Sequence, residues 1–334
     1  MNGDDMIIST RIRLARNVDG LPFPQKCGER AARDIVNKVE EMLIPVDKFT
    51  RYDIAGLSDV DGNALREKHL ISSDLLTDSP FGAALVSADE TVSVMVNEED
   101  HIREQVIMDG LSLDQAYDKI AKIDDVIGNG IRFAYSPRFG YLTACATNLG
   151  TGMRASVMMF LPALTIGRRI DACINDVGRL NMTVRGVYGE GSEAEGYLFQ
   201  ISNQRTLGVT EEEILDSVKS AINHIAEAEI AARSMLLRNE IALKDKIFRA
   251  YGIASNAYSL SSGEAMELLA LIRLGGYYGY MDVSDRRELQ RLVTSCQPAS
   301  IQRYAGQQIS ESDRDILRAK YISTALGKIV KRNA

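Results

Sequence analysis

Three consecutive acidic residues follow an apolar run, and an arginine comes three residues after the last acid, in Asn97-Glu98-Glu99-Asp100-His101-Ile102-Arg103. Carboxylates this close together are costly unless a cation lies between them. A guanidinium is such a cation, because it is planar and two carboxylates can bind its N–H groups through paired hydrogen bonds. The pKa of a guanidinium lies so far above neutral pH that a base must remove its proton before its nitrogen can attack phosphorus. The segment therefore predicts phosphoryl transfer to a guanidino group, with Glu98 and Glu99 catalytic. A solvated acidic turn is the alternative.

The segment Ser9-Thr10-Arg11-Ile12-Arg13 is rich in arginine. On a strand, Arg11 and Arg13 project from the same face because side chains alternate. Two guanidinium groups roughly 6.5–7 Å apart, the length of two strand steps, suit a polyphosphate better than a single carboxylate. A solvated basic edge strand would show the same pattern.

Residues 143–156 combine glycine and threonine between a predicted strand and a predicted helix. The first backbone amides of such a helix favour an anion, and Arg154, if it opens the helix, could reach the same phosphate. Cys145 is a thiolate candidate if cations surround it, and otherwise an inert core residue. The stretch is not a Walker A loop, because G-x-x-x-x-G-K-[ST] does not occur in the chain.

Two further segments carry candidate groups. The stretch 185–193 is rich in glycine and glutamate and includes Glu190, so it is either a loop that closes over substrate or an ordinary hairpin loop. Near the other end, Arg314 and Arg318 are i, i+4 neighbours on one helical face. A phosphate could lie between them while Asp315 binds a guanidinium, and an exposed salt-bridge pair is the alternative.

The periodicity of the apolar residues and the positions of capping and turn residues indicate the helices and strands that position these groups. We expect a strand at 6–8 leading into the arginines, and a hairpin formed by 82–86 and 92–96. Further strands are expected at 131–135, 139–144, 182–188 and 196–201, and helices at 31–43, 113–127 and 154–180, the last interrupted at Pro162. The capping box Thr210-x-x-Glu213 opens a long helix. Beyond about residue 235 the pattern is helical, with segments at 261–276, 285–296 and 312–330. The chain therefore divides into an α+β domain, 1–235, and a smaller all-α domain, 236–334.

Composition excludes several classes of protein. The 334 residues carry 39 basic and 46 acidic side chains, a formal charge of −7, which is unsuited to non-specific nucleic-acid binding. No apolar run reaches the roughly 18 residues that span a membrane. The four cysteines, Cys27, Cys145, Cys173 and Cys296, form no C-x-x-C pair and predict no zinc site. With no signal peptide, we expect a cytoplasmic protein.

Taken together, these segments resemble the phosphagen kinase catalytic domain. The shared patterns are Ser-Thr-Arg-Ile-Arg, Asn-Glu-Glu-Asp-His, Cys-x-Thr-Asn-Leu-Gly-Thr, Arg-Ala-Ser-Val and Arg-Gly-x-x-Gly-Glu. The chain is more closely similar to the bacterial McsB-type protein arginine kinases in Lys68-His69-Leu70-Ile71-Ser72, in the segment from Gly152 to Met158, and in the R-D-x-x-R-A pattern that begins at Arg314. The resemblance covers nearly the whole chain.

The resemblance implies an antiparallel sheet flanked by helices, as in phosphagen kinases and glutamine synthetase, followed by a helical dimerisation domain. It implies ATP as donor, with Mg²⁺ held by the nucleotide phosphates and by no protein ligand. Residues from five parts of the chain would bind ATP: Ser9, Thr10, Arg11, Ile12 and Arg13; His69; Arg103; Arg154, Ala155, Ser156, Val157 and Met158; Arg185, Gly186, Val187, Tyr188, Gly189 and Glu190.

The same resemblance assigns roles to the acceptor side. Glu99 matches the catalytic carboxylate, with Glu98 beside it, and Glu190 matches a second carboxylate on a mobile loop. Cys145 matches a cysteine near the acceptor guanidinium, although Ala146 replaces the proline that usually follows it. Arg314, Asp315 and Arg318 match a phosphoarginine-binding, allosteric pocket.

The function implied is ATP-dependent phosphorylation of arginine side chains in proteins, marking them for a Clp-type unfoldase and protease. An McsA-type activator, substrate proteins with exposed arginines and a second copy of the chain would be its partners. Two alternatives stay open: a phosphagen kinase acting on free arginine or creatine, and a non-catalytic scaffold that binds phosphoarginine.

Overall fold

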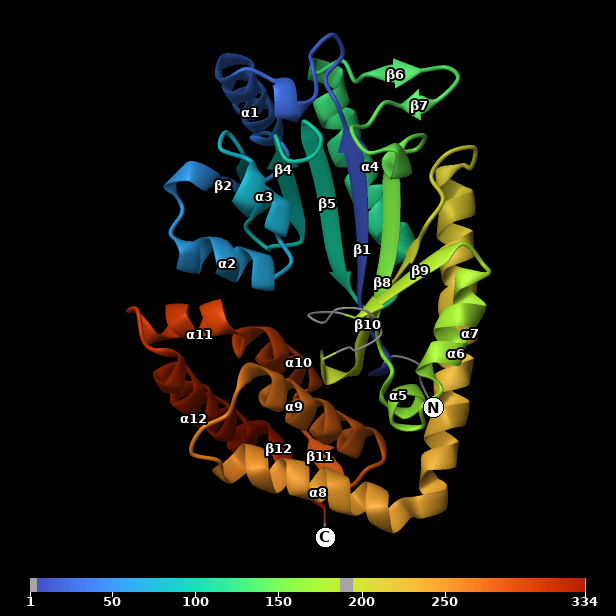
Figure 1. Cartoon of the computed structure of the whole chain (residues 1–334), viewed down its shortest axis with the longest axis vertical. Helices are drawn as coiled ribbons and strands as arrows, with labels where there is room; N and C mark the ends of the chain where they lie inside the picture. Colours follow the sequence, from blue (N-terminus) through green and yellow to red (C-terminus); the bar gives the residue numbers. More distant parts are fainter. Residues whose placement is uncertain (1–4, 187–194, 334) are drawn as a thin grey trace.

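The computed structural model describes residues 5–186 and 195–333. Its N-terminal part is built on an eight-stranded sheet in the order β2-β3-β4-β5-β1-β8-β10-β9 (Figure 1), in which every neighbouring pair is antiparallel. Strand β1 lies at the centre, although it comes first in the chain. The strands are β1 (Ile7–Arg16), β2 (Phe49–Asp53), β3 (Ala83–Ser87), β4 (Val92–Val96), β5 (Ile102–Asp109), β8 (Met153–Phe160), β9 (Met182–Gly186) and β10 (Leu198–Asn203).

Three helices cover one face of this sheet: α1 (Glu29–Leu43), α4 (Leu113–Gly130) and α7 (Glu211–Leu236). They pack there because alternate residues of the central strands, such as Ile12 and Leu14, are apolar and fully buried against their apolar stripes. This packing forms the main hydrophobic core of the protein.

The opposite face of the sheet is covered only in part. Helices α2 (Asp59–Glu67) and α3 (Ser73–Asp78) close it at the β2–β4 end, over a small core around Leu70, Leu75 and Met95. The middle of this face, over β5, β1 and β8, carries polar and charged side chains. Two short helices, α5 (Pro162–Ile166) and α6 (Ile170–Gly178), lie near the β9 edge of the sheet and pack against α7, so they belong to the main core.

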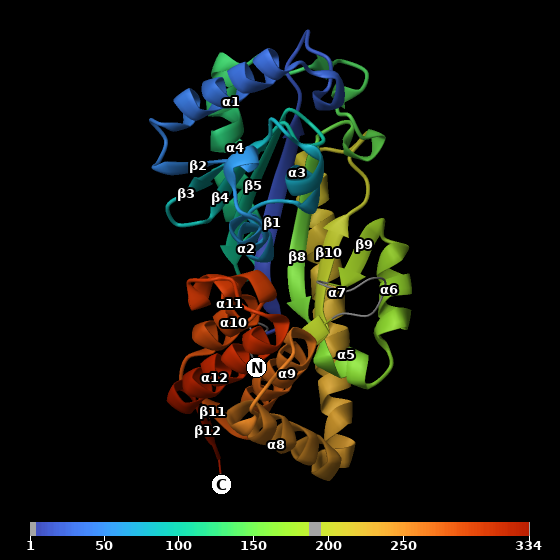
Figure 2. The ribbon, with the colours of Figure 1, turned by 60° about the vertical axis from the view of Figure 1, so that its left-hand side comes forward.

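The C-terminal lobe lies below one end of the sheet (Figures 1 and 2). It consists of α8 (Glu240–Asn256), α9 (Ser262–Tyr277), α10 (Arg286–Ser295), α11 (Pro298–Ala305) and α12 (Glu311–Ile329), and of a small ribbon formed by β11 (Met281–Val283) and β12 (Val330–Arg332). These helices surround a second hydrophobic core. Among the described residues, no helix combines the length and apolar content needed to cross a bilayer.

The architecture confirms the predicted α+β class and most of the expected elements. The hairpin of β3 and β4 and the capping box of Thr210 with Glu213 are present as predicted. The strands expected at 131–135 and 139–144 shrink to two short pieces, β6 (Tyr135–Ser136) and β7 (Gly140–Tyr141).

One prediction is wrong: residues 154–160 form strand β8 and are not the first part of a helix. The segment Met153–Phe160 alternates, with Met153, Ala155, Val157 and Met159 buried on the helix-covered side. Methionine, alanine and arginine are good helix formers, but hydrogen bonding to β1 on one side and β10 on the other outweighs that preference. The loop before it therefore leads into a strand, so no helix N-terminus is available there for an anion.

Candidate active site

Five arginines from four strands share the open face of the sheet. Arg11 and Arg13 project from β1 as predicted, Arg103 from β5, Arg154 from β8 and Arg185 from β9. Their registers place them together, since Arg13 lies directly opposite Arg154 and Arg103 lies opposite Ala15, which is on the same side of β1 as Arg13. Arg185 lies opposite Gln200 of β10.

This arginine cluster has an excess of positive charge. Burial first, and then repulsion from neighbouring arginines, lowers the pKa of Arg13 well below its ordinary value and that of Arg11 to about 10. The pKa of Arg154 is lowered for the same reasons. The buried Nε atoms of Arg13 and Arg154 have no hydrogen-bond partner among the described residues. Like charges placed directly across a sheet destabilise it, so this face is suited to an anion that carries several charges.

Neutral polar groups complete the floor of the face. Arg11 donates from Nη2 to Oε1 of Gln200 at 2.5 Å, and Arg154 donates from Nη2 to Oγ of Ser202 at 2.8 Å. Ser156 is buried beside them and donates to the carbonyl oxygen of Arg11. Sequence reasoning missed Gln200 and Ser202, whose only local signal is that they alternate with apolar residues along β10.

Because side chains alternate along a strand, the predicted nucleotide contacts on β1 and β8 fall on both faces of the sheet. Ser9 and Met158 lie on the same face as the arginine cluster. The side chains of Thr10, Ile12, Ala155 and Val157 point to the helix-covered side and are fully buried. Thr10 there donates from Oγ1 to the carbonyl oxygen of Gly110 at 2.7 Å.

The acidic turn lies between β4 and β5, at the opposite end of the arginine cluster from the C-terminal lobe. Its three acids are in different surroundings. The Glu98 side chain is fully buried and accepts hydrogen bonds from Ser72 and from Nη1 of Arg103. Glu99 is 35% exposed, and its carboxylate lies 3.5 Å from Nη2 of Arg103. Burial raises the pKa of Glu99, although Arg103 opposes the shift.

Asp100, the third acid, connects this turn to the loop that contains Cys145. Its Oδ1 accepts from Nδ2 of Asn17 at 2.6 Å and from the backbone N–H of Ala144 at 2.7 Å. In addition, Nδ2 of Asn148 donates to Glu99 at 3.3 Å. The fold therefore brings the partly exposed Cys145 to the side of the turn that Glu99 faces, and its Sγ lies 3.0 Å from Oγ1 of Thr147.

A cavity of about 580 Å³ opens beside the acidic turn. Four of its lining residues are acids: Asp74 and Asp78, exposed on α3, and Glu98 and Glu99. The other lining residues include Gln25, Cys27 and Phe81, and no lysine or arginine is among those that line it in the described part of the chain. Sequence reasoning missed Asp74 and Asp78, which are separated by one helical turn.

His69 lies at the other side of the arginine cluster. Nε2 of Gln105, on the floor of the sheet, donates to its carbonyl oxygen at 2.7 Å. Burial, and then the charge of Arg11, lowers the pKa of His69 to about 4, so the imidazole is neutral at pH 7. A neutral aromatic ring beside an anion-binding face can stack on the base or ribose of a nucleotide.

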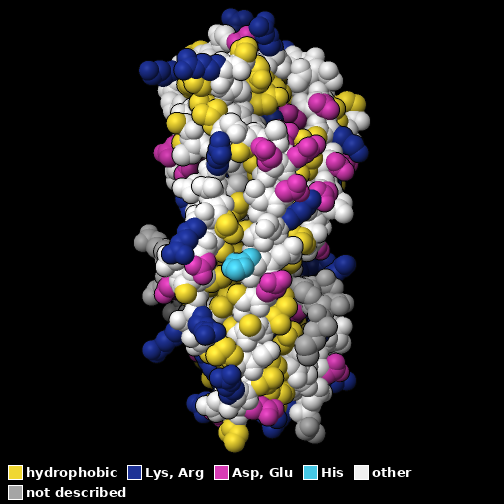
Figure 3. All heavy atoms as spheres, turned by 90° about the vertical axis from the view of Figure 1, so that its right-hand side faces the viewer, with side chains coloured by type: hydrophobic (Ala, Val, Ile, Leu, Met, Phe, Trp, Pro, Cys, Tyr) yellow, Lys and Arg dark blue, Asp and Glu magenta, His cyan; other side chains and the backbone are white. Residues whose placement is uncertain are grey.

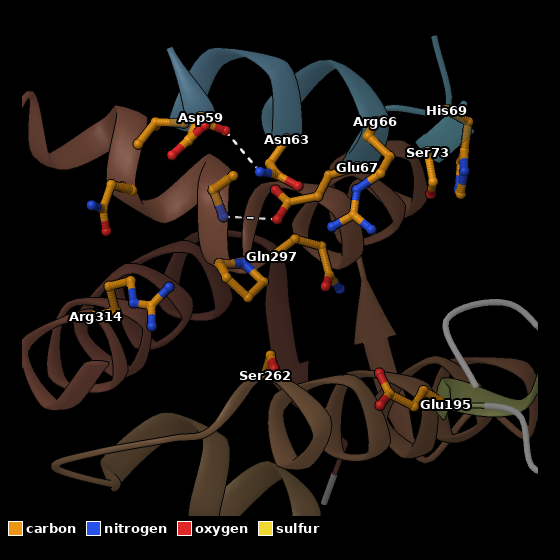
Figure 4. A pocket seen from close by; sticks show the side chains of 14 residues that line it. Asp59, Asn63, Arg66, Glu67, His69, Ser73, Glu195, Ser262, Gln297 and Arg314 are labelled. Carbon is orange, nitrogen blue, oxygen red and sulfur yellow. Dashed lines mark hydrogen bonds between the residues drawn. The ribbon is translucent and has the colours of Figure 1, made fainter. Parts of the chain in front are cut away.

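The predicted phosphoarginine residues lie in the C-terminal lobe. Arg314 lines a cavity of about 610 Å³ between α2 and the C-terminal lobe (Figure 4), and its buried Nε has no hydrogen-bond partner among the residues described. Arg318 is buried and donates to the carbonyl oxygens of Cys296 and Leu260, each at 2.7 Å, and to Asp315. In this structure Arg318 therefore joins α12 to its neighbours.

Four predicted site residues, Val187, Tyr188, Gly189 and Glu190, lie outside the described residues. Gly186, also predicted, ends strand β9 next to Arg185. Within the described ranges, no three His, Cys, Asp or Glu side chains are grouped as a metal site.

Comparison with known proteins shows which family shares this sequence and fold. Residues 31–232 match the family model of the ATP:guanido phosphotransferase C-terminal catalytic domain, and residues 240–334 match that of the protein-arginine kinase McsB C-terminal domain. A protein-arginine kinase of Caldanaerobacter subterraneus subsp. tengcongensis is 44% identical over 97% of this chain and 98% of its own length. One from Clostridium kluyveri is 41% identical over 96% of this chain and 94% of its own length.

Solved structures give the same fold. A duplicated taurocyamine kinase from Schistosoma mansoni, solved with components of a transition-state analogue, aligns with a TM-score of 0.61 at 27% identity over 69% of this chain and 34% of its own. Lombricine kinase aligns with a TM-score of 0.61 at 24% identity over 70% of this chain and 68% of its own, a similarity that shows the fold alone.

Proposed function

This chain belongs to the ATP:guanido phosphotransferase family and, within it, to the protein-arginine kinases; it is therefore a kinase that phosphorylates arginine, and we propose that its donor is ATP and its acceptor an arginine side chain of another protein. The observation that supports this proposal best is the arginine cluster, which has more positive charge than the described residues neutralise and which adjoins a cavity lined by acids. A polyphosphate and a guanidinium are the two ligands that such a pair of sites would bind.

On the donor side, the arginine cluster binds the phosphates. Arg11, Arg13, Arg103, Arg154 and Arg185 converge from strands whose backbones are fixed by the sheet, so the guanidinium groups are in place before the nucleotide arrives. Catalysis of phosphoryl transfer is mostly positioning and charge stabilisation. Mg²⁺, held by the phosphates, would neutralise further negative charge on the transferring group. His69 would contact the nucleoside end.

On the acceptor side, the guanidinium of the substrate enters the acidic cavity. Glu98 is fixed by Ser72 and Arg103, which leaves the more exposed Glu99 to accept a proton from the attacking nitrogen. The raised pKa of Glu99 makes it a better proton acceptor. A bond then forms between that nitrogen and the γ-phosphorus, the bond from phosphorus to the β,γ-bridging oxygen breaks, and ADP leaves. We assign Glu190 the role of second carboxylate and Cys145 that of a group close to the guanidinium.

Two observations favour a protein acceptor over free arginine. The curated relatives that are 41–44% identical are named protein-arginine kinases. The acidic cavity also has exposed walls, where Asp74 and Asp78 lie on the surface of α3 and can meet a substrate that continues beyond the arginine side chain. Free arginine or creatine remains the second candidate, since a structural relative at 27% identity is named a taurocyamine kinase and not a protein kinase.

We further propose a role in protein quality control, with phosphorylated proteins passed to a Clp-type unfoldase and protease and an McsA-type protein as activator. Arg314, Asp315 and Arg318 would bind phosphoarginine and regulate the enzyme.

A second copy of the chain would pack on the C-terminal half. Figure 3 shows hydrophobic side chains gathering in the lower half of the face formed by α7 and α8, where Ile230, Met235, Leu237 and Ile241 are exposed. The four free cysteines fit a reducing cytoplasm.

The deciding experiment is incubation with γ-labelled ATP and Mg²⁺, with either free arginine or a basic unfolded protein as acceptor. We expect acid-labile label on arginine residues of the protein and little label on free arginine. Label on free arginine alone would favour the phosphagen kinase alternative. Label on neither, together with binding of phosphoarginine peptides, would favour the scaffold.

A further inference from the structure

One buried carboxylate of the N-terminal lobe accepts hydrogen bonds from the C-terminal lobe. Glu67, the last residue of α2 (Figure 4), is 6% exposed. It accepts hydrogen bonds from the backbone N–H groups of Ala299 at 2.7 Å and Ser300 at 2.8 Å. The hydroxyl of Ser300 donates to it as well, at 2.8 Å. The N-cap residue of α11, Gln297, makes no side-chain cap hydrogen bond. The first turn of α11 therefore obtains its capping acceptor from the other lobe.

The residues that follow Glu67 continue directly into the nucleotide side of the active site. Helix α2 ends with the N–H of His69 bonded to the carbonyl of Arg66 and the N–H of Leu70 bonded to that of Leu65, the Schellman arrangement. His69 takes the left-handed position of that motif, with φ 60°, which glycine normally occupies. A histidine there is strained and persists only if its surroundings hold it. The imidazole therefore moves with the last turn of α2.

Three residues further on, the same segment reaches the catalytic turn. Ser72 caps α3 by accepting from the N–H of Leu75, and its hydroxyl donates to Glu98. Over six residues the chain thus contacts α11 through Glu67, the arginine cluster through His69, and the acidic turn through Ser72. The cavity that contains Arg314 also lies at this junction, because Glu67 and His69 line it from the other side.

We propose that Glu67 is a positioning residue: by binding the first turn of α11 it holds α2, and through α2 His69, so that affinity for nucleotide depends on the contact between the two lobes. The inference rests on the proposed nucleotide site. The sheet holds His69 from below, through Gln105, and Glu67 supplies the second anchor, from the C-terminal lobe. Since coupling between sites is reciprocal, bound nucleotide also strengthens the contact between the lobes.

The test is the affinity of the full chain for ADP, measured by isothermal titration calorimetry. Glu67→Gln replaces a carboxylate that accepts three hydrogen bonds by an amide whose NH₂ group cannot accept. We expect its dissociation constant for ADP to rise on the order of tenfold, within the usual 5–150-fold range for coupled sites. Glu67→Asp, which keeps the charge, should recover part of the affinity, and Ser300→Ala, which removes one of the three donors, should give a smaller rise.

The matched control is Asp61→Asn. Asp61 lies on the same helix and pairs with Arg303 of α11 at 3.4 Å, but both side chains are about half exposed. We expect ADP affinity unchanged in this variant, because an exposed pair contributes little.

A double-mutant cycle with His69→Ala separates positioning from general loss of structure. If Glu67 acts through His69, Glu67→Gln adds no further loss of ADP affinity once the imidazole is gone. Full additivity in the cycle, or unchanged ADP affinity in both Glu67→Gln and Ser300→Ala, would overturn the proposal. If Glu67→Gln does not fold, Ser300→Ala alone decides. Failure of the wild-type chain to bind ADP would instead refute the proposed nucleotide site.

Discussion

Replacing Arg11 by methionine should stabilise the free protein while it weakens nucleotide binding. Burial and the neighbouring arginines lower the pKa of Arg11 to about 10. At about 1.4 kcal/mol per pKa unit, keeping the guanidinium charged at pH 7 destabilises the folded state by at most about 3 kcal/mol. The sign follows from proton linkage: this cost is fully present below a pH of about 10, and it fades as the pH rises from there toward the ordinary pKa of arginine, because the folded protein loses the proton first.

The net effect is smaller than this upper bound. Methionine is unbranched and uncharged, and it fills a similar space without the repulsion. The variant loses the hydrogen bond to Gln200, which contributes about 1 kcal/mol. Arg11 is also partly exposed, so solvent screens some of the repulsion. We expect the free energy of unfolding of the nucleotide-free variant to exceed that of the wild type by about 1–2 kcal/mol.

Urea denaturation at pH 7, with and without ATP, measures both effects. At 100 times its dissociation constant, a ligand stabilises the wild type by about 2.7 kcal/mol, and the variant should gain far less at the same concentration. The control is Arg16→Met on the same strand. Arg16 is 1% exposed and bonds to Asp124 twice, at 2.9 and 2.8 Å. Burial alone would lower the pKa of Arg16, but Asp124 raises it.

The two arginines should therefore respond in opposite directions. Arg16→Met breaks a buried ion pair and should cost about 3 kcal/mol or more. If Arg11→Met destabilises the free protein to a similar degree, Arg11 is a structural residue and the arginine cluster is not a strained anion site. If ATP stabilises the Arg11 variant as fully as the wild type, Arg11 does not contact the phosphates.

Three other changes have defined outcomes. Glu99→Gln should abolish labelling of protein arginine and leave ADP affinity within about twofold, because the base is lost and the phosphate site is not; near-full turnover would remove Glu99 from that role. Glu229→Gln should lower the free energy of unfolding by about 3–5 kcal/mol, since Glu229 is fully buried, caps α5 and pairs with a buried arginine at 2.8 Å. The control is Glu227→Gln, at an exposed position, which should change the free energy of unfolding by less than about 0.5 kcal/mol in the same urea experiment. Burial lowers the pKa of His69 to about 4, so stability should fall as pH drops from about 6.5 toward 4, by at most about 1.4 kcal/mol per pH unit; urea titrations across this range should show a shallower slope for His69→Gln, and an equal slope would contradict the shift.

The sequence predicted best the features that depend on nearest neighbours along the chain. Alternation placed Arg11 and Arg13 on one face of a strand, and the capping box at Thr210 marked the start of α7. Both depend on local geometry that a few residues define. Arg154 was assigned to the wrong kind of element because its partners, β1 and β10, are distant in sequence, and only their register places it opposite Arg13.

Residues without a motif were missed for the same reason. Glu67, Gln200 and Ser202 belong to no recognised motif, and nothing around them in the sequence identifies a ligand. Each acquires its role from a segment more than 40 residues away: Glu67 from α11, and Ser202 from Arg154. A sequence contains these pairs, but without the sheet register and the packing of the lobes it does not indicate which residues meet.

The acidic turn shows how far neighbouring residues of one type can differ in role. Read from the sequence, Glu98, Glu99 and Asp100 are three equivalent carboxylates that could all bind a guanidinium. In the structure Asp100 is committed to Asn17 and to the backbone of the Cys145 loop, and Oε1 of Glu98 is committed to Ser72 and Arg103. Only Glu99 combines partial exposure with a raised pKa and a place on the wall of the acidic cavity. The turn therefore contains one carboxylate that positions Arg103, one that anchors a loop and one that remains available to take the proton.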